Sequence, residues 1–335
     1  MPPLLAHARG LWAARQRSLG HYTRATLAAY LAAWRQQPTP ARLLAWLAFR
    51  RDMGLPVPAR FVPALRDGLP RLEAPRRRAA LGLLAEARPE SVGQVKPHWL
   101  ADAAPHVPPV AANVLPASPL ARVARLQADW RHAFAAEVAR AANGRGVQVV
   151  GNAAGLRGQS LGAAIDAAEL VVRFNQFATG PQWAADVGQR TDVWVVSPGY
   201  DGPTPAAVRW VVVSGPDMLF RLQDWRYLGP LLQQDTPVLT VPLPQWRACV
   251  ATLQAPPSAG VLILQWLRSL NAGRGWAGIR AAGIGFGVGP RQQPYHLALP
   301  QQKPGHRHAW PAEAAWLARW QAEGLRRLDA GAAHG

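Results

Sequence analysis

Apolar residues recur at spacings of three and four over the first part of the chain, which indicates amphipathic helices. One such run contains Leu27, Tyr30, Leu31 and Trp34. Prolines fall between the runs, where a missing backbone N–H disturbs a helix least. We therefore expect an all-helical N-terminal region over residues 1–104.

The next stretch, residues 105–119, contains five prolines and is predicted to be a linker. A helical pattern then extends over Leu120–Ala142. We expect this long helix to open a second domain that occupies residues 120–335.

Beyond Gly146 the pattern changes, because short β-prone runs alternate with helical ones. The predicted strands are Val147–Val150, Leu170–Phe174, Val193–Val196, Val208–Val213, Val238–Val241 and Ile279–Ile284. The predicted helices are Leu156–Ala167, Leu219–Gln233, Val261–Leu270 and Pro311–Arg327, the last packing Trp316, Leu317 and Trp320 against the sheet. This alternation is typical of an α/β fold with a mainly parallel sheet flanked by helices.

Composition limits the classes of function. A chain of 335 residues with 49% hydrophobic residues can bury a large core. Its formal charge of +18 would suit nucleic acid, an anionic membrane surface or an acidic substrate. The basic residues are nearly all arginine, however, the only lysines being Lys96 and Lys303, and alanine and proline are abundant. This usage is typical of a GC-rich bacterial genome. Without a basic block or a recognised motif, nucleic-acid binding is disfavoured.

The single cysteine, Cys249, excludes an intramolecular disulfide. Residues Met1–Trp12 lack the pattern of a signal peptide, and no apolar run is long enough to cross a bilayer. We expect a cytoplasmic protein, with peripheral contact at the inner face of the cytoplasmic membrane as an open alternative.

Two asparagines follow adjacent predicted strands. Gly151 and Asn152 come after the first strand, and Asn175 comes after the second. Open α/β sheets bind nucleotides at such strand ends, and a carboxamide can both donate and accept hydrogen bonds there. The alternative is that both asparagines are ordinary turn residues. The segment D-V-G-Q-R-T-D follows at Asp186–Asp192.

Further motifs appear in order along the chain. They are Pro257-Ser258-Ala259-Gly260 before a helix, Gly285-Phe286-Gly287 after a strand, Tyr295-His296, and His308 with Glu313 in an H-x-x-x-x-E pattern. Ser258 is predicted to cap the helix, and free N–H groups in the first turn could hold an anion. An ordinary N-cap is the alternative.

Together these segments resemble the large, small, third and very small sialylmotifs of glycosyltransferase family 29, the sialyltransferases. The resemblance covers roughly Gly146–Gly324. It implies a modified Rossmann-like core, a GT-A-like variant. It also implies inverting, metal-independent transfer of sialic acid from CMP-sialic acid to a glycan hydroxyl, here in the synthesis of a bacterial surface polysaccharide or lipooligosaccharide. The CMP-sugar is then a donor substrate, and no cofactor is expected.

The resemblance also assigns roles to residues. His308 is the expected general base and His296 is expected to steady the leaving phosphate, while Glu313 orients its motif. The proximity of His306 leaves the choice of base open. The residues expected at the donor are Gly151, Asn152, Asn175, Ser197, Ser258, Ala259, Gly260, Gly285, Phe286 and Gly287. No metal ligand is expected, since there is neither a D-x-D sequence near the expected donor site nor a Cys/His cluster.

Asp166 and Arg173 also match the large motif, where we expect paired or capping roles rather than catalysis. The sequence departs from the animal enzymes at two positions. Val147 stands where they have a disulfide-forming cysteine, and Ser197-Pro198 stands where they often have Tyr-Pro. The second change removes a phenol that could contact the donor phosphate.

Other functions remain open at this stage. The closest is a transferase of the same family that uses another CMP-sugar such as CMP-Kdo. A second is an inactive transferase-like protein whose helical region binds a partner. A nicotinamide-dependent Rossmann enzyme is disfavoured, because Gly151, Gly155 and Gly158 do not form G-x-G-x-x-G. The acceptor, the linkage and the role of the N-terminal region are not determined by the sequence.

Overall fold

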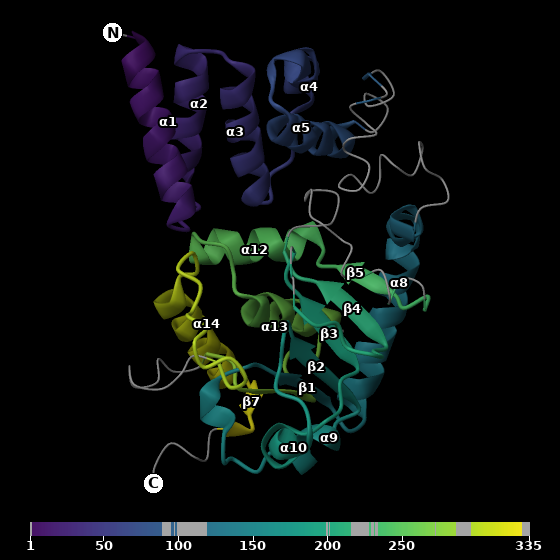
Figure 1. Ribbon diagram of the computed structural model, residues 1–335. Helices are drawn as coiled ribbons and strands as arrows, with labels where there is room; N and C mark the ends of the chain where they lie inside the picture. Colours follow the sequence, from purple (N-terminus) through teal and green to yellow (C-terminus); the bar gives the residue numbers. More distant parts are fainter. Residues whose placement is uncertain are drawn as a thin grey trace.

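The computed structural model has a seven-stranded sheet with helices on both faces and a layer of N-terminal helices at one end (Figure 1). It describes residues 2–88, 95–96, 98, 119–198, 200, 202–215, 228, 231, 234–271, 273–285 and 296–329. Among the described helices, none combines the length and the apolar sequence that crossing a bilayer needs.

Every strand pairing in the described sheet is parallel. The strands are β1 (Val147–Val150), β2 (Leu170–Phe174), β3 (Val193–Val196), β4 (Trp210–Val213), β5 (Val238–Thr240), β6 (Ile279–Ala282) and β7 (Arg326–Arg327). Their order across the sheet is β5-β4-β3-β2-β1-β6-β7. Because successive side chains of a strand point to opposite faces, the apolar runs in β1 to β5 bury residues against both helical layers. The predicted α/β fold class is confirmed.

One face of the sheet is covered by α8 (Pro119–Asn143), α13 (Ala259–Leu270) and α14 (Trp310–Ala322). Phe134 of α8 lies edge-on to Trp210 of β4, and their ring centroids are 5.3 Å apart. Leu317 and Trp320 of α14 are buried in the same hydrophobic cluster as residues of the strands, and Trp316 packs against that cluster, as predicted for this helix. The other face is covered in part by α9 (Gly162–Asp166) and α10 (Pro181–Val187).

The N-terminal region is helical, as predicted. Its helices are α1 (Pro2–Ser18), α2 (Arg24–Gln36), α3 (Pro40–Asp52), α4 (Val62–Gly68) and α5 (Ala74–Ala87). Thr23 and Thr39 cap α2 and α3, because each side chain accepts a hydrogen bond from an N–H in the first turn.

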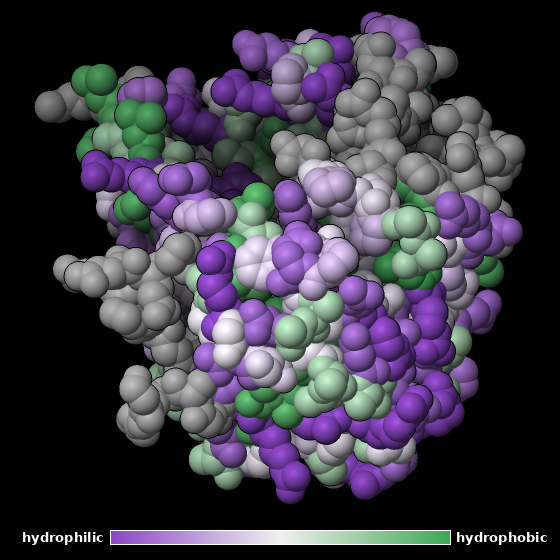
Figure 2. Space-filling model, turned by 60° about the horizontal axis from the view of Figure 1, so that its bottom comes forward, coloured by the Kyte–Doolittle hydropathy of each residue, from purple (hydrophilic) through white to green (hydrophobic). Residues whose placement is uncertain are grey.

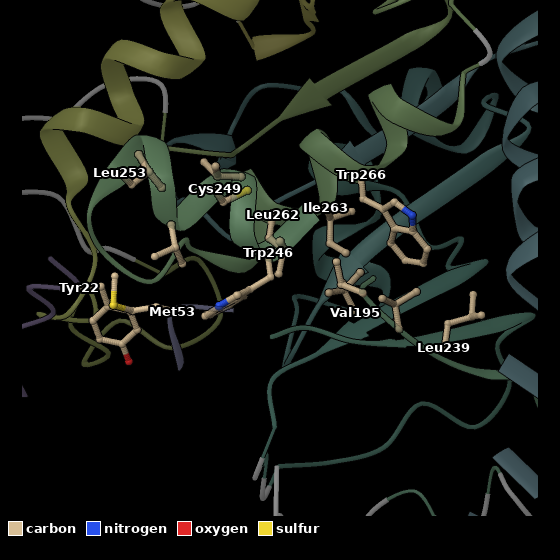
Figure 3. Packing of buried hydrophobic residues seen from close by; sticks show 14 of the residues in the cluster. Tyr22, Met53, Val195, Leu239, Trp246, Cys249, Leu253, Leu262, Ile263 and Trp266 are labelled. Carbon is tan, nitrogen blue, oxygen red and sulfur yellow. The ribbon is translucent and has the colours of Figure 1, made fainter. Parts of the chain in front are cut away.

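Helix α12 (Leu243–Leu253) joins the N-terminal region to the sheet. Trp246 of α12 donates to the carbonyl of Asp52 over 2.7 Å, and Arg247 donates to the carbonyl of Gly54 over 2.7 Å. In Figure 3, Tyr22 and Met53 lie beside α12, and α13 fills the space between α12 and the strands. The two regions therefore share one hydrophobic core.

Two predicted helices have other bounds in the structure. The predicted helix Leu156–Ala167 is a 3-10 turn at Ala154–Leu156 followed by α9, since Gly158 and Ser160 between them have positive φ angles. The last helix ends at Ala322 rather than Arg327, because Gly324 at φ 110° turns the chain into β7. Most of the predicted helix Leu219–Gln233 and nearly all of the predicted linker lie outside the described residues. The division into domains at residues 104 and 119 remains a prediction.

Candidate active site

The strand order places a topological switch point between β1 and β6. From β1 the chain builds β2 to β5 on one side, and it then crosses over to place β6 and β7 on the other side. In open α/β sheets the connections at such a point leave in opposite directions and open a crevice at the carboxyl ends of the strands. The sequence motifs follow β1, β2, β3 and β6, so this edge of the sheet is the candidate site.

Glycines allow close backbone approach at this edge. A Cβ at Gly151 would collide with the carbonyl of Gly283, which follows β6. A Cβ at Gly260, in the first turn of α13, would lie 3.0 Å from Cγ2 of Ile284. Because Ile284 also borders Gly151, the β1 turn and the start of α13 meet at one place. Gly285 is exposed one residue further on. Phe286 and Gly287 lie outside the described residues.

Asn152 links the β1 turn to two neighbouring segments. Its Nδ2 donates to the carbonyls of Phe174 and Gln176 over 2.9 and 3.2 Å. Its own carbonyl accepts from the N–H of Leu297 at 2.8 Å. Through its side chain and its main-chain carbonyl together, Asn152 holds the turn after β2 next to the segment that contains His296.

Asn175 adopts a left-handed conformation with φ 47°, which asparagine tolerates better than most residues. Its Oδ1 accepts from the backbone N–H of Ser197 over 2.8 Å, so the turns after β2 and β3 are joined. The Nδ2 of Asn175 has no hydrogen-bond partner among the described residues. It is a free donor at the candidate site.

His296 is buried, and the backbone uses both of its ring nitrogens. Nδ1 accepts from the N–H groups of Ala298 and Leu299 over 3.1 and 3.0 Å. Nε2 must then carry the proton and donate to the carbonyl of Gln176 over 3.0 Å. Burial lowers the pKa of His296, with an opposing contribution from the Gln176 carbonyl. As placed, His296 is neutral and orders the loop. Nε2 can contact a phosphate only if it gives up its hydrogen bond to the carbonyl of Gln176.

The N-terminus of α13 combines a cap with free donors. The side chain of Ser258 caps the helix by accepting from the N–H of Val261 over 3.4 Å. Within the described residues the N–H groups of Ala259 and Gly260 have no partner. Two parallel N–H groups at the positive end of a helix dipole are suited to an anion. The predicted N-cap at Ser258 is confirmed.

Glu313 connects α14 to the N-terminus of α13 by a hydrogen bond. Its Oε1 accepts from the N–H of Ser258 over 2.7 Å, and its side chain is buried. Burial raises the pKa of Glu313, while the Ser258 N–H and the charge of His308 lower it in part. The carboxyl thus connects the second and fourth sequence motifs.

His308 precedes α14 and has an ordered tautomer. Its Nδ1 lies 2.8 Å from the carbonyl of Pro256, which can only accept, so Nδ1 carries the proton. Nε2 is therefore unprotonated in the neutral ring and can accept a proton. The imidazole packs edge-on against Trp310, with ring centroids 5.1 Å apart.

The segment before His308 rests on the turn between α1 and α2. Nε2 of His306 donates to the carbonyl of Ser18 over 3.1 Å, and a guanidinium nitrogen of Arg307 donates to the hydroxyl of Tyr22. Gly20 has φ 83°, and a Cβ there would collide with the carbonyl of Arg307. His306 is thus directed towards the N-terminal region, whereas His308 is directed towards the segment that precedes α13.

Asp166 and Arg173 have the structural roles expected of them. Asp166 accepts from the backbone N–H groups of Gln189 and Arg190, both over 2.9 Å. The buried Arg173 donates to the carbonyls of Arg190 and Val187. Burial lowers the pKa of Arg173 to about 10, partly opposed by Asp166. These residues hold the D-V-G-Q-R-T-D segment against β2.

Two further features bear on chemistry. No cluster of three or more His, Cys, Asp or Glu residues that could hold a metal ion occurs in the described part of the chain. Cys249 is a buried residue of α12, where burial and the charge of Glu313 raise its pKa to about 12. This thiol is therefore un-ionised at neutral pH.

Sequence reasoning missed several groups at the site. The carbonyls of Gln176 and Pro256 fix the tautomers of the two histidines, but a main-chain group has no sequence signature. Contacts of the Ser18–Tyr22 turn join residues almost 290 positions apart. Gly283 was detectable, since it begins a run of alternating glycines with the recognised Gly285.

The part of the chain that contains β1 to β4 matches a known protein family. Residues 126–211, from within α8 to β4, match the model of glycosyltransferase family 29 (sialyltransferase). The match shows that this segment is similar to glycosyltransferases of the sialyltransferase type, and it bears out the expected enzyme class. Comparison with curated protein sequences gave no match.

Two solved structures also align with the chain. One is a mammalian sialyltransferase in complex with Gal-beta-1-3GalNAc-ortho-nitrophenol, with 18% identity and a TM-score of 0.39 over 54% of this chain and 68% of that chain. The other is a mammalian sialyltransferase, with 19% identity and a TM-score of 0.41 over 54% of this chain and 67% of that chain.

Proposed function

We propose that this protein transfers sialic acid from CMP-sialic acid to a glycan hydroxyl, with inversion and without a metal ion. The family match supports the donor class. The observation that carries the proposal is the tautomer of His308, whose Nδ1 donates to the carbonyl of Pro256, two residues before the α13 cap, and whose Nε2 is left unprotonated. The arginine-, alanine- and proline-rich composition favours a bacterial acceptor, a surface polysaccharide or lipooligosaccharide.

The donor is held by groups that the protein leaves free. The N–H groups of Ala259 and Gly260 receive the CMP phosphate, and the α13 dipole adds to the attraction. The Nδ2 of Asn175 provides a further donor at the end of β2. Asn152 contributes by holding the β1 and β2 turns together. These hydrogen bonds hold the nucleotide without a metal cation.

Transfer then needs one proton movement. The acceptor oxygen attacks the anomeric carbon of the sialic acid while the bond from that carbon to the phosphate oxygen breaks. The phosphate leaves with the electron pair, and Nε2 of His308 takes the acceptor proton. The carbonyl of Pro256 accepts from Nδ1 and holds the ring in place while Nε2 takes the proton. His308 is thus the general base, and Glu313 positions it through α14.

CMP binding tests the nucleotide site. CMP should raise the melting temperature of the wild-type protein, since ligand at 100 times its Kd stabilises a protein by about 2.7 kcal/mol. The Asn175→Ala and Asn152→Ala variants should lose most of this increase, measured by thermal shift. A metal chelator should leave it unchanged, and a requirement for a divalent ion would contradict metal-free binding.

Asn271→Ala provides a matched control. Asn271 also donates from Nδ2 to two carbonyls, those of Gly275 and Ala277, but it precedes β6 at the opposite edge of the sheet. This variant should melt at a lower temperature and keep the full CMP-induced increase. Equal increases in the wild type and all three variants would refute the site.

The donor sugar is tested by incubating the protein separately with CMP-sialic acid and CMP-Kdo and measuring CMP release. Faster release from CMP-sialic acid supports the proposal. Release from CMP-Kdo alone would assign the other sugar to the same site. Binding of CMP without release from either donor would favour an inactive transferase-like protein.

A further inference from the structure

The outward face of α1 is apolar. Large hydrophobic residues that are strongly exposed gather here, and they are Leu4, Leu5, Leu11, Trp12 and Leu19, with 74, 54, 59, 46 and 44% of their surface accessible. Leu19 continues the helical path, since its N–H bonds the carbonyl of Arg15 over 3.0 Å. Spacings of seven and eight residues bring these side chains to one side of the helix.

The opposite side of α1 packs against α2. Ala6 and Ala13 are buried there, and a Cβ at Gly10 would lie 3.9 Å from that of Ala33. Helix α1 forms the outer edge of the N-terminal layer (Figure 1), and hydrophobic surface is visible at that edge of the molecule (Figure 2). Among the described elements, none covers the apolar face of α1.

The charge around this face has one sign. Helix α1 contains Arg9, Arg15 and Arg17 and no acidic residue. Arg9 and Arg15 are exposed, and Arg15 lies one turn before Leu19 on the apolar side. Residues 1–88 carry 15 arginines against four acidic residues, a net charge of +11 out of the +18 of the whole chain. A surface that matches this face must be both apolar and negatively charged.

We propose that α1 docks the protein onto an anionic lipid bilayer. The helix lies in the plane of the interface, with Leu4, Leu11 and Trp12 at the boundary between headgroups and acyl chains. Arg9 and Arg15 meet the lipid phosphates. This docking is independent of the transfer chemistry.

A second copy of the chain fits the same face less well. Pairing two α1 faces would bring the arginines of both copies together, and α1 offers no carboxylate to neutralise them. A bilayer of anionic lipid supplies both the apolar depth and the opposite charge. The experiment therefore compares binding to anionic lipid with self-association of the protein.

Vesicle flotation with the full-length protein measures the binding. The probes are vesicles of phosphatidylcholine alone and of phosphatidylcholine mixed equally with phosphatidylglycerol. The wild type should float with the mixed vesicles and not with the neutral ones, and added salt should weaken the binding. Flotation that is absent with the anionic vesicles, or equal with both kinds, would overturn the proposal.

Variants separate the apolar and the charged contributions. Leu11→Gln with Trp12→Gln should lower the partition coefficient by on the order of tenfold or more, because two anchors leave the acyl boundary. Arg9→Gln with Arg15→Gln should lower it by roughly fivefold for each arginine. Because all four side chains are exposed, the variants should keep the wild-type melting temperature.

Arg326→Gln is the matched charge control. Arg326 is exposed on β7, at the opposite end of the molecule from α1 (Figure 1). This variant should bind vesicles like the wild type, and a loss as large as that from an α1 arginine would show that net charge alone drives binding. Self-association in sedimentation that the Leu11/Trp12 variant abolishes, without lipid binding, would assign the face to a second copy.

Discussion

The two histidines of the site show how main-chain partners decide what a side chain can do. In His296 the backbone uses both nitrogens and Nδ1 is the acceptor. In His308 the proton is on Nδ1, and Nε2 is left to accept another. Sequence motifs identified both residues, but the carbonyls that distinguish them belong to Gln176 and Pro256. This difference could not be predicted, because any residue type supplies the same carbonyl.

The lowered pKa of His296 predicts a pH dependence of stability. Between its folded pKa and the ordinary value near 6.5, the unfolded chain binds more protons at this residue than the folded protein does. The contribution of His296 to the free energy of unfolding is therefore complete above about pH 6.5 and is lost as the pH falls below it, by at most about 1.4 kcal/mol per pH unit.

Urea unfolding of the wild type and of His296→Asn across pH 5 to 7.5 isolates this contribution. The difference in unfolding free energy should shrink on acidification, since asparagine does not titrate. Glu313 is present in both proteins. Its titration therefore cancels in the difference as long as Glu313 does not interact with residue 296. A difference that stays constant with pH would show that His296 is not held neutral.

At the scale of elements, the strands were predictable and their ends were less so. The predicted strands form because short apolar runs rich in valine are buried on both faces of the sheet. The two-residue β7 was missed because Arg326 and Arg327 carry no apolar pattern, and only the turn at Gly324 directs them to β6. The approach of α14 to α13 was not predictable either, since it depends on a contact between residues 55 positions apart.

Glu313 is predicted to stabilise the contact between these two helices. Glu313→Ala leaves the N–H of Ser258 without its partner and should lower the free energy of unfolding by about 1–3 kcal/mol. Glu313→Gln keeps an acceptor oxygen at the same place and should cost less than the alanine change. Chemical denaturation compares the two, and equal losses would show that the hydrogen bond is not what stabilises the contact.

The turn at Gly20 is predicted to support the segment before His308. Gly20→Ala introduces a Cβ at a positive φ angle and against the carbonyl of Arg307. It should destabilise the protein by more than about 1 kcal/mol and lower turnover more than CMP affinity. Gly273→Ala is the control, because Gly273 has φ 80° but open space around its Cα. Equal effects of the two changes on turnover would show that the contact with Arg307 is unimportant.

At the scale of the whole molecule, the N-terminal helices and the sheet domain form one packed body. Sequence patterning separated them correctly into a helical and an α/β part. It gave no indication that Trp246 and Arg247 of α12 would bond to the carbonyls of Asp52 and Gly54. The N-terminal layer therefore covers α12 and braces the His308 segment, in addition to presenting the proposed lipid-binding face.

A shortened chain beginning at Pro119 tests this integration. Removing α1 to α5 takes away the Asp52 carbonyl that the buried indole of Trp246 in α12 bonds, and exposing a large apolar side chain such as this costs about 1.5–3 kcal/mol. We expect the shortened protein to lose its cooperative thermal transition in calorimetry. A sharp transition with normal CMP binding would instead show that residues 120–335 fold independently, as the predicted domain boundary implies.

The rate of transfer by His308→Ala shows whether His308 is the general base. With CMP-sialic acid and an accepted glycan, the wild type should release CMP and form the glycoside. His308→Ala should do so 10²–10⁴-fold more slowly, the usual contribution of a general base, and should bind CMP with nearly unchanged affinity. His306→Ala should keep most of the activity, because its ring contacts Ser18 rather than the segment before α13. Transfer by His308→Ala at close to the wild-type rate would show that another group takes the acceptor proton.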